Sequence, residues 1–91
     1  MFLDDVIVHE RVHLRHPDVS DDDVIYAWHH KIKERKRPKT DPTQYAAVGF
    51  DSHGRLLEMC AVRNLDVDAM VVFHAMRATR KMMEELKLDK G

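Results

Sequence analysis

The histidines near the N-terminus have a spacing that could hold a metal ion. His9-Glu10-Arg11-Val12-His13 matches the H-E-x-x-H pattern, in which two histidines one helical turn apart bind zinc and the glutamate acts as a base. If residues 9–16 are helical, His16 lies on the same face. However, seven histidines in the chain make a chance match easy, Pro17 ends the helix soon after, and no later segment supplies a convincing third ligand. We therefore expect no metal and no other cofactor, and a zinc-dependent hydrolase is the least favoured function.

Charge is strongly segregated along the chain, although the net charge is only -1. Residues 1–30 contain seven acidic and two basic residues, whereas residues 31–40 contain six basic residues and one acidic residue. A basic block of this kind can contact phosphate groups. The alternative is a solvated helix end, where cations are favoured by the helix dipole.

Length and composition indicate a single folded domain over residues 1–91. Hydrophobic residues make up 44% of the chain and charged residues 34%, which is enough for a core and unlike a disordered segment. The only cysteine, Cys60, cannot form a disulfide within the chain. No apolar run approaches the roughly 20 residues that span a bilayer, and no secretory leader is recognisable. We expect a cytoplasmic protein with no membrane partner.

The first half of the chain predicts two helices. After a short strand or turn, a helix is expected over about 9–16, and Pro17 ends it. A second helix is expected over about 20–35, because Ser20 and the acidic residues that follow it suit a helix start. Its buried stripe is predicted to be Val24, Ile25, Trp28 and Ile32.

From Tyr45 onwards the hydrophobic period changes to that of strands. The runs 45–50 and 55–62 flank a turn in which Gly54 can adopt a positive φ, and 69–73 is expected to be the central strand. Helical spacing returns over 77–87. The predicted class is α+β, with two N-terminal helices on a three- to four-stranded antiparallel meander and a C-terminal helix.

Three segments carry a resemblance to a known family. Residues 15–24 contain a basic residue and a histidine before a turn, then a serine and an acidic helix start. Residues 49–57 read as a hairpin whose second strand begins with Gly54-Arg55-Leu56. Residues 74–80 read as a strand end followed by a small residue, a basic residue and another small residue at the start of the last helix. In this order they resemble the BrnT-type toxins, which are RelE-like ribonucleases of bacterial toxin–antitoxin pairs, or a related group of small RelE-like proteins.

The resemblance implies RNA cleavage without a metal ion. A base takes the proton from a ribose 2′-hydroxyl, the oxygen attacks phosphorus, cations stabilise the added negative charge, and an acid protonates the leaving 5′-oxygen. The catalytic candidates are His16 and His74 as acid and base, with Arg55 and Arg77 on the phosphate. We expect Arg55, His74 and Arg77 to form one pocket, because antiparallel pairing brings the start of one strand next to the end of the following strand. His16 from the first helix is expected to lie in the same pocket. The RNA-binding candidates are Arg63, Arg80 and Lys81.

The same resemblance implies two kinds of partner. One is RNA or the ribosome, and the other is a cognate antitoxin protein. A homodimer is also considered, because methionines in the last helix would give it apolar surface if they are exposed. The alternative function is a non-catalytic RelE-like module that binds a protein through the same basic surface.

Overall fold

The fold is given by a computed structural model, which describes residues 5–88. Within this range the chain forms five strands and three helices, which agrees with the predicted α+β class. None of these helices is long and apolar enough to cross a membrane. In chain order the elements are β1 (Asp5–Val8), α1 (Arg11–Arg15), α2 (Asp21–His29), β2 (Lys31–Lys36), β3 (Gln44–Phe50), β4 (Leu56–Asn64), β5 (Ala69–Arg77) and α3 (Arg80–Glu85).

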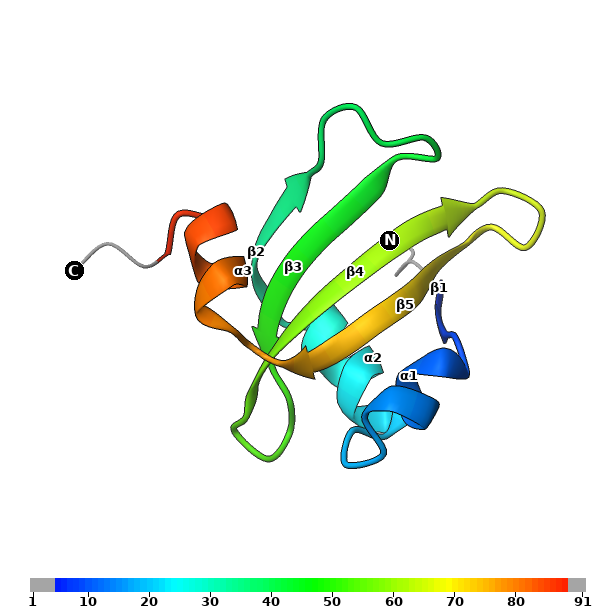
Figure 1. Ribbon diagram of the computed structural model, residues 1–91. Coiled ribbons are helices and arrows are strands. Elements are labelled where there is room, and N and C mark those ends of the chain that lie inside the picture. Colours follow the sequence, from blue (N-terminus) through cyan, green and yellow to red (C-terminus); the bar gives the residue numbers. More distant parts are fainter. Residues whose placement is uncertain (1–4, 89–91) are drawn as a thin grey trace.

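The strands form one mixed sheet in the order β1-β5-β4-β3-β2 (Figure 1). Strands β2 to β5 make an antiparallel meander, and β1 lies parallel to β5 at the opposite edge from β2. The predicted meander of three to four strands is therefore incomplete. It lacks the parallel strand β1 at one edge and the basic strand β2 at the other.

Helix α2 begins where the sequence predicts but ends earlier. The Ser20 hydroxyl accepts a hydrogen bond from the Asp23 backbone N–H at 3.1 Å, and the Asp23 carboxylate accepts one from the Ser20 N–H at 3.0 Å. This reciprocal pair satisfies two N–H groups that a helix start would otherwise leave unpaired. The helix ends at His29, so the predicted range of 20–35 is wrong at its C-terminal end.

The basic block is an edge strand and not a helix end. Lys31–Lys36 pairs with β3, and its residues are largely exposed. Trp28 is buried on α2, but Ile32 is 55% exposed, so the apolar stripe of the helix does not extend into the block. Alternating exposed lysine and arginine side chains are typical of edge strands, where they discourage pairing with another chain.

Three other predicted boundaries also change. Strand β5 extends to Arg77, beyond the predicted 69–73, and β4 is the middle strand of the sheet. Helix α3 is shorter than the predicted 77–87, because Thr79 caps it by accepting a hydrogen bond from the Met82 N–H at 3.3 Å. Helix α1 likewise covers Arg11–Arg15 and not 9–16.

Apolar side chains pack on both faces of the sheet. Helices α1 and α2 cover one face through Val12, Val24 and Trp28, and α3 covers the other through Met82 and Leu86. Met82 is only 4% exposed, and Met83 is partly buried in the same cluster. Helix α3 therefore does not present the exposed methionines on which the expectation of a homodimer rests.

A bulge in β5 decides which face receives His74. Cys60 of β4 pairs with His74, whereas the next residue, Ala61, pairs with Val72, so Phe73 is the extra residue. Val72 and Ala75 both belong to the cluster under α1 and α2. Without the bulge, the two-residue period of the strand would direct His74 into that apolar cluster. With it, His74 shares the α3 face with Cys60.

Replacing Gly49 with alanine should destabilise the fold. A Cβ at Gly49 would lie 2.2 Å from the Ala27 carbonyl oxygen and 2.9 Å from the Lys31 Cα, so backbone must move. We expect a loss of about 1–3 kcal/mol in the free energy of unfolding, measured by urea denaturation. Ser52→Ala at an exposed turn position is the control and should change little. Equal midpoints for the two variants would contradict the close approach of α2 to β3.

Candidate functional site

A pocket of about 280 Å³ lies on the α3 face of the sheet. Strands β4 and β5 form its floor, α3 forms one wall, and α1 reaches its rim. Apolar groups of Phe73 and Met82 line part of it. Its polar lining consists of Arg11, Arg37, Glu58, His74, Thr79, Lys81 and Glu85.

The central polar group of the pocket is the carboxylate of Glu58. Its side chain is 7% exposed, and it accepts three hydrogen bonds. The donors are His74 Nε2 at 2.7 Å, the Thr79 backbone N–H at 2.8 Å and the Thr79 hydroxyl at 2.6 Å. Burial would raise the pKa of Glu58, but these hydrogen bonds outweigh it and hold the pKa below its ordinary value. Glu58 is therefore a carboxylate at neutral pH.

The Glu58 carboxylate fixes the proton arrangement of His74. An ionised carboxylate can only accept hydrogen bonds, so the proton between the two groups lies on Nε2. In a neutral imidazole the other nitrogen, Nδ1, then carries no proton and can accept one. The pair has the arrangement of a histidine base that is oriented by a buried carboxylate. The carboxylate also stabilises the imidazolium that forms when the histidine is protonated.

A second imidazole lies beside His74. The rings of His16 and His74 meet edge to face, with 6.3 Å between their centroids and 87° between their planes. His16 is held at the end of α1, where its N–H donates to the Val12 carbonyl at 2.8 Å and its own carbonyl accepts from the Val19 N–H at 3.0 Å. Both histidines are partly exposed. Two imidazoles, each able to give or accept a proton, thus lie next to each other on different elements.

One end of the pocket is closed by an ion pair between β2 and α3. The guanidinium that follows β2, Arg37, donates from Nε to Glu85 Oε2 and from Nη2 to Oε1, each at 2.8 Å. The hydrogen bond from Arg37 holds the pKa of Glu85 below its ordinary value. Arg37 also donates to the Gln44 side chain at 3.0 Å. Its charge is therefore largely compensated within the protein.

Two exposed cations at the pocket could bind an anion. Arg11 comes from the first turn of α1 and Lys81 from the first turn of α3, and both line the pocket. The pocket thus combines an oriented histidine with two exposed cations, and a second histidine contacts the first from the end of α1. These groups are suited to acid–base chemistry on a phosphate ester.

The structure places only part of the predicted site in this pocket. It brings His16 and His74 together, and it adds Lys81 from the predicted RNA-binding set. Arg77 pairs with Leu57, whose side chain is buried under α1 and α2. Opposite residues of a ladder face the same side, so Arg77 lies on the other face of the sheet from His74.

The other two predicted RNA-binding arginines lie outside the pocket. Arg63 forms an ion pair with Asp68 at 3.2 Å, and it lines a separate hollow with Trp28 and Tyr45. Arg80 is 90% exposed at the start of α3, with Glu84 at 3.7 Å.

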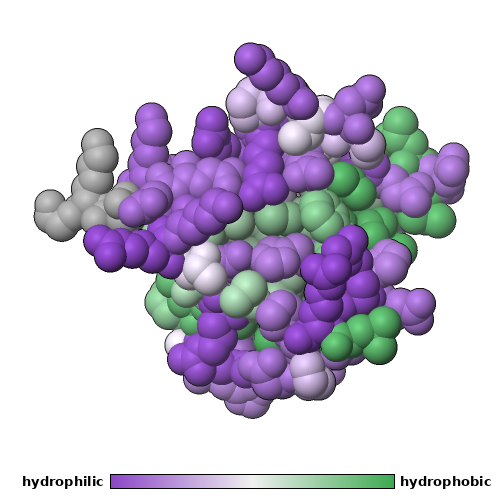
Figure 2. Space-filling model, in the orientation of Figure 1, coloured by the Kyte–Doolittle hydropathy of each residue, from purple (hydrophilic) through white to green (hydrophobic). Residues whose placement is uncertain are grey.

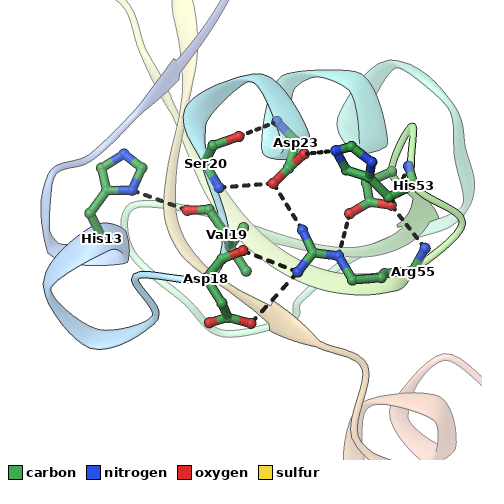
Figure 3. A network of polar contacts seen from close by, with 8 residues as sticks. His13, Asp18, Val19, Ser20, Asp23, His53 and Arg55 are labelled. Atoms are coloured by element: carbon green, nitrogen blue, oxygen red, sulfur yellow. Dashed lines mark hydrogen bonds and ion pairs between the residues drawn. The ribbon is translucent and has the colours of Figure 1, made fainter.

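Arg55 belongs to a separate network of polar contacts (Figure 3). Its guanidinium donates to Asp51 Oδ2 at 2.8 Å and to Asp23 Oδ2 at 2.9 Å, and it contacts the Asp18 carbonyl oxygen at 3.0 Å. The Asp51 side chain is fully buried, and three hydrogen bonds from His53 and Arg55 reach it. The predicted single pocket of Arg55, His74 and Arg77 is therefore wrong, because Arg55 joins the β3–β4 turn to the start of α2.

The residues of the H-E-x-x-H pattern do not share a helical face. His9 precedes α1 and accepts a hydrogen bond from the Arg11 N–H at 3.1 Å, and Glu10 is the cap residue of α1. The two ring nitrogens of His13 contact the Val19 carbonyl oxygen and the Asp21 carboxylate. Over residues 5–88, no group of three or more His, Cys, Asp or Glu side chains could hold a metal ion.

Sequence reasoning missed five polar groups of the pocket, namely Arg11, Arg37, Glu58, Thr79 and Glu85. Only Glu58 leaves a recognisable signal, because it lies within the apolar run Leu56-Leu57-Glu58-Met59-Cys60. A carboxylate in a buried strand needs hydrogen-bond partners, so such a position predicts a polar site. The other four depend on where α1, β2 and α3 meet the sheet.

Replacing Arg55 with methionine should lower the thermal unfolding midpoint. The change keeps most of the side-chain volume but leaves the buried Asp51 carboxylate without its guanidinium partner. Arg80→Met removes the same charge from a side chain that is 90% exposed and serves as the control. We expect a clear drop for Arg55→Met alone, followed by circular dichroism. If the two variants melt together, Arg55 is not a structural residue.

Comparison with known proteins leaves the family open. Searches against protein-family models, curated proteins and solved structures find no match to this chain. The relation to BrnT-type toxins therefore stays a prediction from the residues. What the protein does is inferred from the pocket around Glu58 and His74.

Proposed function

We propose that this chain is a ribonuclease that cleaves RNA without a metal ion. The observation that supports the proposal is the contact of His16 with His74, whose ring is in turn oriented by the buried Glu58. In keeping with the resemblance to BrnT-type toxins, we propose that it is the toxin of a bacterial toxin–antitoxin pair and acts in the cytoplasm.

His74 is assigned as the base and His16 as the acid. Nδ1 of His74 takes the proton from a ribose 2′-hydroxyl, and the oxygen forms a bond to the neighbouring phosphorus. Protonated His16 gives its proton to the 5′-oxygen as the bond from phosphorus to that oxygen breaks. The products are a 2′,3′-cyclic phosphate and a 5′-hydroxyl. This assignment follows from Glu58, which stabilises the imidazolium that forms on His74.

The remaining groups have supporting roles in the proposal. Arg11 and Lys81 bind the phosphate and stabilise the negative charge that develops on it. Glu58 is a positioning residue, because it acts through His74 and does not touch the substrate. Arg55 and Arg77 have no part, since one is held by aspartates and the other lies on the opposite face.

The proposal includes a protein partner. A ribonuclease acting on cellular RNA or on ribosome-bound RNA needs an inhibitor, and the resemblance implies a cognate antitoxin. Such a partner would silence the enzyme most directly by covering the pocket, where Arg11 and Lys81 are exposed. An RNA substrate and the antitoxin would then compete for the same groups.

The purified protein should cleave RNA in the presence of a metal chelator, and its expression should arrest bacterial growth. His74→Ala and His16→Ala should each lower kcat/KM on the order of 10²–10⁴-fold, because each removes one proton-transfer group. His30→Ala, at the exposed end of α2, is the matched control and should leave the rate unchanged. A folded wild-type protein that cleaves no RNA would favour the non-catalytic binding module.

The dependence of kcat/KM on pH should reveal Glu58 as a positioning residue. Catalysis by one base and one acid gives a bell-shaped dependence of kcat/KM on pH, and the acidic limb reports the base. Glu58→Gln removes a charge that favours the imidazolium, so the acidic limb should move to lower pH and the maximum should fall. Glu84→Gln, a solvent-exposed change on α3, should leave both limbs in place. An acidic limb that is the same in both variants would remove Glu58 from the proposal.

A further inference from the structure

A row of cations lies on the α3 face of the edge strand β2. Lys33 pairs with Val48 and Arg35 with Ala46, and both partners belong to the apolar cluster under α3. Opposite residues share a face, so Lys33 and Arg35 lie on the same side of the sheet as the Glu58–His74 pocket. Lys36 pairs with Tyr45, which packs against the cluster under α1 and α2, so Lys36 lies on the other side.

The row continues into the pocket. A hollow of about 230 Å³ between β2 and the end of α3 is lined by Lys33, Glu34, Arg35, Glu85, Leu86 and Lys87. The Glu34 carboxylate forms an ion pair with the Lys31 ammonium group at 3.4 Å. Glu85 also lines the pocket that contains His74, so the hollow and the pocket adjoin at the Arg37–Glu85 ion pair. Because Arg37 binds Glu85 through two hydrogen bonds, the carboxylate does not interrupt the row with an uncompensated negative charge.

The chemistry of the row favours a polyanion over a protein. Lys33, Arg35 and Lys87 are exposed, and they present ammonium and guanidinium groups only. Protein interfaces have apolar or aromatic anchors at their centre, whereas phosphate backbones are bound by such exposed cations. Hydrophilic side chains cover the molecule where α3 and the β2–β3 loop lie (Figure 2).

We infer that Lys33, Arg35 and Lys87 form a binding track for the phosphates of a single-stranded RNA whose reacting nucleotide occupies the Glu58–His74 pocket. The inference rests on the proposed function and specifies how its substrate binds. An unpaired strand is required because the 2′-hydroxyl and its phosphate must enter a pocket beside α3. Contacts along the track increase the affinity for RNA that extends beyond the cleaved bond, and they are independent of sequence.

Binding without cleavage tests the track directly. The probe is a single-stranded RNA of about eight nucleotides that is 2′-O-methylated throughout, so that the attacking oxygen is blocked. Lys33→Gln should weaken binding several-fold at low salt and reduce the slope of log K against log salt by about 0.7, the value for one phosphate contact. Lys36→Gln removes the same charge from the opposite face of the same strand and should change neither quantity. Equal effects of the two variants, or no binding by the wild type, would overturn the track and leave an acidic protein partner as the alternative.

Cleavage assays separate failure of the track from failure of the proposed function. A dinucleotide fills only the pocket, so Lys33→Gln should leave its kcat/KM unchanged while raising KM for the longer unmodified RNA. Cleavage by the wild type with no selective effect of Lys33→Gln on the longer substrate would overturn the track and keep the nuclease. Selective binding of the methylated probe with no cleavage of any RNA would keep the track and overturn the nuclease.

Discussion

The buried carboxylate of Glu58 is the group on which the pocket depends. Placing a charge in the middle of a strand under α3 is unfavourable unless hydrogen bonds replace those of water. Three donors do so, and they come from the next strand and from the start of α3. Because Thr79 also caps α3, the same residue holds the carboxylate and starts the helix. The orientation of His74 and the start of α3 are therefore tied to the same carboxylate.

Two buried acidic centres of the protein differ in what surrounds them. The Arg55 guanidinium donates hydrogen bonds to the carboxylates of Asp51 and Asp23, and it thereby joins the β3–β4 turn to α2. Glu58 is met by an imidazole that stays partly exposed and can exchange a proton with a ligand. A guanidinium does not lose its proton, so the first centre is structural, whereas the second can take part in chemistry.

The sequence predicted the parts of the fold that depend on local patterns. The Ser20 cap, the turn with Gly54 at a φ of 80° and the apolar strands are determined by neighbouring residues. Strand β2 was not predictable in this way, because a solvated strand and a solvated helix end have the same composition. The bulge at Phe73 is set by packing across β4 and β5, and it gives His74 its face of the sheet. The contact of His16 with His74 was expected, but the roles of Glu58 and Arg55 required the tertiary structure.

The parallel pairing of β1 with β5 determines which part of the molecule opens first by local unfolding. Strands β2 to β5 follow one another along the chain, so the pairing of each strand with the next closes only a short loop. Strand β1, in contrast, pairs with β5, which lies more than half the chain away in sequence. Over residues 5–88, β1 pairs with β5 at four positions, and the His9 N–H donates to the Val72 carbonyl at 2.9 Å just beyond them. Helix α1, which leads to His16, follows directly. Local opening of this edge would separate the two imidazoles while Glu58 and His74 stay in contact. The proposed acid and base thus belong to regions of unequal local stability, and the proposed activity would be lost well before the sheet unfolds.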